Sequence, residues 1–142
     1  MKKRLLFTGM IIMSLRISSC VKDEVFKGPP SLSELKIFPV TPRDVDVVSV
    51  SVKATDMNGI RSVTLYYKIN DGSFTGTAMV VLGGAPDVYS ALIPAQTSGS
   101  SVYYYVEATN SSDQTVRIPA DAPATTASYT IGAPSIVMNE VY

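Results

Sequence analysis

The sequence of 142 residues contains no histidine, no tryptophan and a single cysteine. Without histidine there is no Ser-His-Asp or Cys-His catalytic arrangement, and the commonest side-chain ligand of transition metals is missing. One cysteine excludes an intrachain disulfide and a zinc site built on several cysteines. Twelve Lys and Arg residues balance twelve Asp and Glu residues, unlike the basic surface of a nucleic-acid-binding protein. We therefore expect no cofactor and no nucleic-acid partner.

The beginning of the chain has the pattern of an export signal. Three cations at positions 2–4 precede a mostly apolar run over residues 5–15. A basic segment, an apolar run of about 7–15 residues and small residues at a cleavage site characterise a signal peptide. A transmembrane helix needs about 20 apolar residues, and Arg16 ends this run too early. We predict that residues 1–19 are a signal peptide, whose removal leaves eight cations against twelve acids, a net charge of −4.

The cysteine follows this segment directly. Residues 17–20, Ile-Ser-Ser-Cys, resemble the lipobox of bacterial lipoproteins, although Ile17 and Ser19 are not the commonest residues at their positions. The resemblance implies cleavage between Ser19 and Cys20, a diacylglyceryl group on the Cys20 thiol and acylation of the new amine. Several acyl chains anchor a protein stably where one chain binds only reversibly. The alternative is a lone structural thiol near an ordinary secretory cleavage site.

The next segment has the composition of a tether. Residues 22–24, Lys-Asp-Glu, resemble the surface-export signal of some Gram-negative lipoproteins, which implies an outer-membrane protein that faces outward. The alternative is a charged linker, which leaves a periplasmic orientation open. Glycine and proline at positions 28–30 favour an extended linker with little to bury. We assign residues 20–31 to a lipidated tether.

Period-2 alternation dominates residues 32–132. Apolar side chains at positions 48, 50, 52 and 54 alternate with polar ones, as in an antiparallel strand with one solvated face. The same pattern and the turn residues predict strands near 34–40, 48–55, 62–69, 78–82, 89–93 and 102–108, and a last strand split into 116–118 and 127–131. About seven short strands at this spacing predict an all-β fold, an immunoglobulin-like antiparallel β-sandwich.

Two motifs carry a resemblance to a family. They are Val102-x-Tyr104-x-Val106-x-Ala108-x-Asn110, and Asp56-x-x-Gly59-Ile60 followed by Val63-x-Leu65-x-Tyr67. Over residues 35–132 the chain resembles fibronectin type III and related immunoglobulin-like modules of bacterial surface proteins. It lacks the family's strand-B tryptophan, and Val102 stands where the family's corner tyrosine would be. These departures put the exact subfamily in question, and the resemblance implies a β-sandwich.

A new segment begins near the end of the sequence. Residues 133–142 start with a Pro-containing linker, and residues 136–142, Ile-Val-Met-Asn-Glu-Val-Tyr, have the composition of a strand. This strand resembles the opening strand of a lamin-tail domain, which implies that the chain is the N-terminal piece of a longer surface protein. The alternatives are an extra edge strand or a frayed C-terminus.

Three tyrosines are candidates for ligand binding. The alternation places Tyr66, Tyr103 and Tyr105 on the outward face of two strands that are neighbours in this fold. Tyrosine combines flat apolar area with a hydroxyl, so such rings can stack on a sugar or anchor a protein partner. The alternative is that these rings form cross-strand pairs that only stabilise the sheet.

Five turn residues are candidates for a calcium site. Carboxylate and amide oxygens, which calcium prefers, occur in three loops that share one end of a fibronectin-like sandwich: Asp56, Asn58, Asp87, Asn110 and Asp113. The alternative is that Asp and Asn are simply good turn formers.

The sequence favours a binding or adhesion module displayed at the bacterial outer-membrane surface, with a glycan or a protein as its ligand. A structural spacer that carries a larger C-terminal domain is the alternative. An enzyme would need paired acid and base groups in a cleft, and the acidic residues here stand singly in loops. We therefore expect no catalysis.

Overall fold

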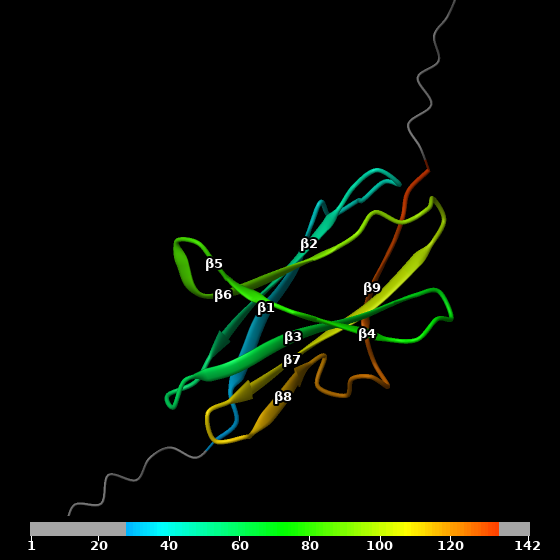
Figure 1. The fold of residues 1–142 in the computed structure, drawn as a ribbon. Coiled ribbons are helices and arrows are strands. Elements are labelled where there is room, and N and C mark those ends of the chain that lie inside the picture. The colour runs from blue at the N-terminus through cyan, green and yellow to red at the C-terminus, as the bar shows by residue number, and fades with distance from the viewer. Residues whose placement is uncertain (1–27, 134–142) are drawn as a thin grey trace, which may run out of the picture.

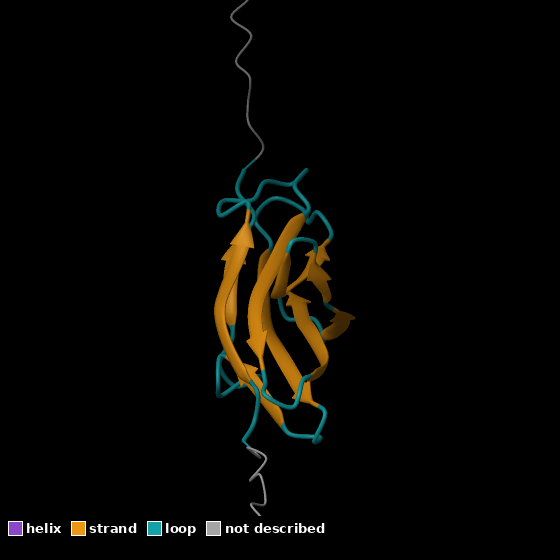
Figure 2. Cartoon of the chain, turned by 90° about the vertical axis from the view of Figure 1, so that its left-hand side faces the viewer, coloured by secondary structure: helices purple, strands orange, loops and turns teal. Residues whose placement is uncertain are grey.

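Two antiparallel β-sheets pack face to face in the computed structural model, which describes residues 28–133 (Figures 1 and 2). One sheet has the order β1-β2-β6-β5, and the other has the order β4-β3-β7-β8, with β9 also paired to β7. The strands of the described residues are β1 (Ser31–Phe38), β2 (Val48–Thr55), β3 (Ile60–Ile69), β4 (Thr75–Ala78), β5 (Val80–Leu82), β6 (Ala85–Ile93), β7 (Ser101–Asn110), β8 (Thr115–Ile118) and β9 (Ala127–Thr130). The prediction of an all-β immunoglobulin-like sandwich is confirmed. Among the described residues, no helix is long and apolar enough to cross a membrane.

The core lies between the two sheets and follows the alternation in the sequence. In β2, every second side chain is almost fully buried, while the intervening residues are more accessible. The facing sheet contributes the inward residues of β3 and β7. The largest of the fully buried apolar side chains in the strands come from both sheets: Val48, Val50, Val52, Leu65, Ile93, Val102 and Val106. Burial of these side chains supplies the main driving force for folding.

The last strand is interrupted as the sequence indicates. β8 pairs with residues 106–109 of β7, and β9 pairs with residues 101–104 of the same strand. Between them the chain leaves the sheet at Pro119, because proline lacks the amide hydrogen that a ladder needs. The prediction of a split last strand is confirmed.

The predicted single strand at 78–82 is wrong. The chain forms two short strands there, β4 paired with β3 and β5 paired with β6, so it passes from one sheet to the other. Met79 marks the crossing: its side chain is buried and its amide donates to the carbonyl of Val63 at 2.9 Å. Alternation within one strand cannot distinguish a residue that points into the core from one that bridges two sheets.

The two ends of the described chain lie at opposite ends of the sandwich (Figure 1). The carbonyl of Gly28 accepts a hydrogen bond from Asn110, the last residue of β7. At the other end, Thr130 pairs with Ser101, the first residue of β7. Because β7 is ten residues long, the two ends are separated by about 30 Å at 3.3–3.4 Å per residue.

Two inward tyrosines make the stability sensitive to alkaline pH. The rings of Tyr104 and Tyr129 lie 5.9 Å apart in the core. Burial raises the pKa of Tyr104, and burial raises the pKa of Tyr129 as well, with Tyr104 contributing to the second shift. Between about pH 10, where an unfolded tyrosine ionises, and the higher folded values, only the unfolded state loses protons. The free energy of unfolding should therefore fall as the pH rises above about 10.

Phenolate absorbance checks this expectation. In the folded protein, part of the phenolate absorbance should appear at a higher pH than in the urea-unfolded protein. The urea midpoint of unfolding should fall as the pH rises through the same range. Simultaneous ionisation of all eight tyrosines near pH 10 in the folded protein would contradict it.

Candidate functional site

Four aromatic rings and one lysine gather on the outer face of the second sheet, and we call this set the aromatic strip. It consists of Tyr66, Lys68, Phe74, Tyr103 and Tyr105. The register places Tyr66 opposite Tyr105 and Lys68 opposite Tyr103, so four members share one face of β3 and β7. The fifth, Phe74, lies in the connection between β3 and β4. The structure thus brings the three tyrosines singled out from the sequence onto one surface.

The rings of the aromatic strip cover one another. Tyr66 stacks on Tyr105 with centroids 4.9 Å apart and an interplanar angle of 13°. Phe74 meets Tyr105 edge-on at 5.3 Å. Gly76 is the register partner of Tyr66 on β4, and a Cβ atom there would lie 3.0 Å from the Tyr66 ring, so the ring packs close to the β4 backbone. Close packing of this kind stabilises a sheet through cross-strand pairs.

The expectation that Tyr105 is exposed is wrong. Its side of the sheet is the outer one, but only 7% of its surface is accessible, because Tyr66 and Phe74 cover it. Burial also raises the pKa of the Tyr105 hydroxyl. Tyr66 and Tyr103 are half-buried. Phe74 was missed by the sequence analysis; its only signal was an apolar ring directly after a turn.

Lys68 lies between two rings of the strip. Its ammonium is 5.4 Å from the Phe74 centroid and 5.3 Å from the Tyr103 centroid, both within cation–π range. Among the described residues, the four ion pairs involve other cations, and no carboxylate is within 4.0 Å of this ammonium. The two rings contact the ammonium but do not neutralise it. Within the described residues, the strip therefore carries the positive charge of Lys68 without a paired carboxylate.

An ion pair borders the strip toward β8. Arg117 donates from Nε to Glu107 at 2.8 Å, and the two residues are register partners. This hydrogen bond raises the pKa of Arg117. Arg117 also donates to the carbonyl of Ala122 at 3.2 Å, which fixes the connection between β8 and β9. Glu107 is therefore engaged in a structural contact.

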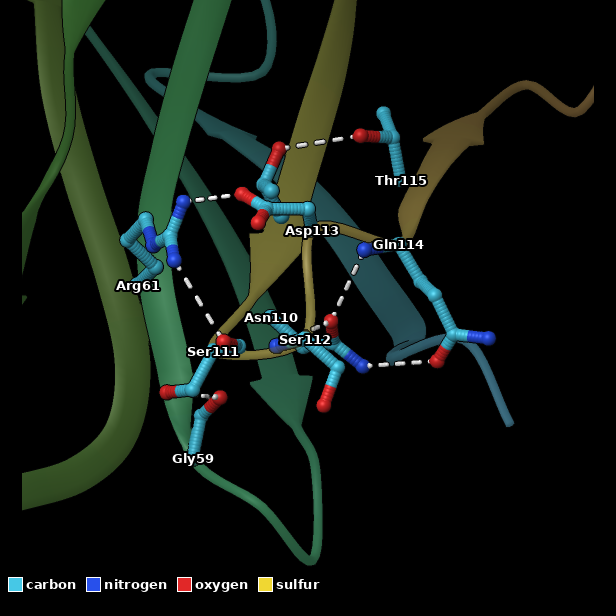
Figure 3. Close-up of polar contacts among 9 residues, drawn as sticks. Gly59, Arg61, Asn110, Ser111, Ser112, Asp113, Gln114 and Thr115 are labelled. Atoms are coloured by element: carbon cyan, nitrogen blue, oxygen red, sulfur yellow. Dashed lines mark hydrogen bonds and ion pairs between the residues drawn. The ribbon is translucent and has the colours of Figure 1, made fainter. Parts of the chain in front are cut away.

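A second polar cluster lies at the end of the sandwich where the chain enters, and Figure 3 shows most of it. Its centre is Asn110, whose side chain is fully buried. The side-chain oxygen accepts from the amides of Ser112 and Gln114 at 3.0 and 2.9 Å. The side-chain nitrogen donates to Asp56 at 3.0 Å, to the Gln114 side chain at 3.1 Å and to Gly28 at 3.2 Å. We call these groups the tether-end network.

The tether-end network contains part of the candidate calcium set. Asp56 and Asn110 meet, but they do so through a hydrogen bond from the amide to the carboxylate. The other oxygen of Asp56 accepts from the backbone amide of Asn58 at 2.7 Å, which is a turn-forming contact. Both carboxylate oxygens therefore serve the fold. Gln114, which the sequence analysis did not single out, completes the cluster.

The remaining members of the set lie elsewhere. Asp113 forms an ion pair with Arg61 across the turn (Figure 3). Asp87 was predicted to lie in a loop, but it lies within β6. It directly precedes Val88, the register partner of Lys53. Within residues 28–133, no group of three or more His, Cys, Asp or Glu side chains could hold a metal ion. Three of the five predicted donors have protein partners instead: the oxygens of Asp56 and Asn110 accept from amides, and Asp113 pairs with Arg61.

The predicted lipidation and cleavage residues lie outside the described part of the chain. Ser19 and Cys20 precede residue 28, and the strand that resembles a lamin-tail domain begins after residue 133. These assignments remain predictions from the sequence.

The chain was also compared with known proteins. No family model and no curated protein matches the sequence. One similar solved structure is that of the Br derivative of BhCBM56. It has a TM-score of 0.49 and 13% identity, and the match covers 72% of this chain and 99% of that chain.

Proposed function

We propose that this chain is a bacterial envelope lipoprotein whose sandwich acts as a non-catalytic spacer between a lipid anchor at Cys20 and the segment that follows Gly132. The observation that carries the proposal is the position of the two ends of the described chain, which leave the sandwich at opposite poles (Figures 1 and 2). A module built this way places whatever follows it about 30 Å farther from the anchor.

The tether-end network supports a fixed attachment point for the tether on the sandwich. Asn110 holds the backbone of Gly28 at the entry pole of the sandwich. Only eight peptide units separate Cys20 from Gly28, so a fully extended tether spans at most about 29 Å. An anchored Cys20 therefore keeps the entry pole within about 29 Å of the membrane. The Lys-Asp-Glu sequence at 22–24 supports display on the outer surface.

The carboxylates near the polar clusters support a non-catalytic role. Glu107 is paired with Arg117, Asp113 with Arg61, and Asp56 with amide donors. General acid–base catalysis needs two such groups aimed at one substrate in a cleft. Here each group is aimed at its own structural partner.

Energy transfer to a membrane tests the spacer role. In the lipidated protein on vesicles, a dye attached through Ala133→Cys should transfer little energy to acceptors in the lipid. The same dye attached through Ser31→Cys should transfer strongly, because Ser31 begins β1 at the entry pole and the two positions are about 30 Å apart along the sandwich. Equal transfer from both positions would contradict the proposal.

Two signal variants control this experiment. Cys20→Ala should abolish incorporation of a labelled lipid precursor and release the protein from membranes. Ser19→Ala, which brings the site closer to the usual lipobox, should remain lipidated. Membrane attachment of the Cys20→Ala protein would show that the anchor is elsewhere.

Ligand binding by the aromatic strip is a second candidate function. The specific observation in its favour is Lys68, whose unneutralised ammonium lies beside the accessible ring of Tyr103. A glycan or a protein segment could contact this half of the strip, since the other half is occupied by the stack of Tyr66 and Tyr105.

A further inference from the structure

The exit pole of the sandwich carries a group of exposed apolar side chains that the fold does not use. We call it the exit surface: Phe38, Val40, Val45, Val47 and Leu92, whose exposed fractions range from 51% for Val47 to 75% for Phe38. Phe38 and Leu92 both pair with Ser49, so they share the outer face of the first sheet. Contiguous exposed apolar groups usually mark an interaction site.

The loop that bears Val40 and Val45 is ordered. The carboxylate of Asp46 accepts from the amide of Arg43 at 2.8 Å, and the amide of Asp46 donates to the carbonyl of Arg43 at 3.0 Å. These bonds close a turn between β1 and β2. The apolar side chains are therefore held in water by a defined backbone, at a cost that a covering partner would remove.

The chain leaves the sandwich next to this loop, as Figure 1 shows at its red end. The amide of Gly132 donates to the carbonyl of Pro42 at 2.9 Å, and Arg43 and Gly132 form a parallel bridge. The carbonyl of Gly132 accepts from the hydroxyl of Ser98 at 3.0 Å. Two hydrogen bonds and this bridge thus fix the exit point beside the exit surface.

The sequence after this point matches the surface in character. Ile136 is four residues beyond Gly132, so its Cα lies within about 14 Å of that of Gly132 whatever path the chain takes. Five of the seven residues at 136–142 are apolar: Ile136, Val137, Met138, Val141 and Tyr142. A short apolar segment that begins this close to the exit surface can pack against it. Such packing would remove the apolar side chains of the segment and of the exit surface from water.

We propose that the exit surface is the docking site of residues 136–142 of the same chain. A second copy of the protein would cover the exit surface but would leave the apolar side chains of this segment in water, so the segment is the better occupant. The docking makes the junction after Gly132 rigid, and in that respect it rests on the proposed spacer role. A rigid junction fixes the direction of whatever follows relative to the sandwich.

Methyl NMR of the mature chain tests the docking. The protein is residues 20–142 with Cys20→Ala, compared with the same protein ending at Ala133. Truncation should shift the methyl resonances of Val40, Val45, Val47 and Leu92. The methyls of Val80 and Val81, which are also exposed but lie on β5, are the matched control and should stay in place. In the longer protein, Val137 should show through-space contacts to the exit surface.

Two point variants extend the test. Val137→Asp in the longer protein should reproduce the shifts caused by truncation, and Val80→Asp should not. Unchanged exit-surface methyls on truncation would overturn the proposal, and so would shifts that disappear on dilution, because those would identify a second copy as the occupant. All measurements are made without a membrane, so their failure would leave the energy-transfer result on the spacer role standing.

Discussion

Replacing Asn110 by alanine is expected to lower the free energy of unfolding by about 3 kcal/mol or more, because it strands several buried polar groups at once. Two backbone amides, those of Ser112 and Gln114, lose their acceptor, and the carboxylate of Asp56 loses a donor. The side chain is fully buried, so water cannot easily replace these bonds. Urea unfolding of the wild-type and variant proteins measures the loss.

Asn110→Asp separates the acceptor role from the donor role. The new carboxylate keeps the oxygen that Ser112 and Gln114 use, but it faces Asp56 where the amide had donated. Burial and like charge would raise the folded pKa of this new group above the unfolded value of about 3.9. The free energy of unfolding of the Asn110→Asp protein should therefore be close to that of the wild type at low pH. The difference should grow as the pH rises above about 4.

An exposed asparagine provides the matched control. The Asn70 side chain accepts from the amide of Ser101 at 2.9 Å in an exposed turn. Asn70→Asp keeps that acceptor and leaves no buried group unpaired, so it should change the stability by less than about 0.5 kcal/mol at any pH. If Asn110→Asp also changed the stability by less than about 0.5 kcal/mol at every pH, the hydrogen bond from Asn110 to Asp56 would not contribute to folding as expected.

Truncation of Tyr105 is expected to cost about 3 kcal/mol, in the range of other buried aromatic residues. The ring is 93% buried and contacts Tyr66 and Phe74, so its removal leaves a hole on the outer face of the sheet. Tyr105→Phe keeps the ring and should preserve most of the stability. Thermal and urea unfolding of both variants measure the difference.

Tyr103→Ala is the comparison that bears on ligand binding. Tyr103 is half-buried and contacts only the ammonium of Lys68 among the recorded ring and cation contacts of the described residues, so its truncation should cost less than about 1 kcal/mol. If the strip binds a glycan, a glycan array should show binding that Tyr103→Ala abolishes while the fold stays intact. Absence of glycan binding by the wild-type protein would remove the glycan form of the second candidate function. A loss of stability from Tyr103→Ala equal to that from Tyr105→Ala would show that the whole strip is structural.

Tyr103 and Tyr105 show that alternation predicts which face of a strand a side chain is on, but not whether the side chain is exposed. The period of two residues per repeat placed both rings on the outer side of β7, and the register agrees. Exposure depends on what stands beside a ring, and the two neighbours that bury Tyr105 come from β3 and from the turn after it. No pattern within β7 contains that information.

Asn110 shows the same limit for polar residues. In the sequence it is an amide in a turn, equally suited to a metal ion, to solvent or to the turn itself. Its partners Gly28 and Asp56 are 82 and 54 residues away along the chain. Only the folded arrangement decides that its side chain is buried and satisfied by protein groups.

The sequence by itself determined the all-β class, the face of each main strand and the interruption of the last strand, because alternation and proline act locally along the backbone. It also carries the prediction of export and lipidation at Cys20. The tertiary structure alone decided that residues 78–82 cross between the sheets, that the calcium set does not assemble, that Tyr105 is covered, and that the chain enters and leaves at opposite poles. These features depend on contacts between residues that are distant in sequence, and such contacts are fixed only when the two sheets pack against each other.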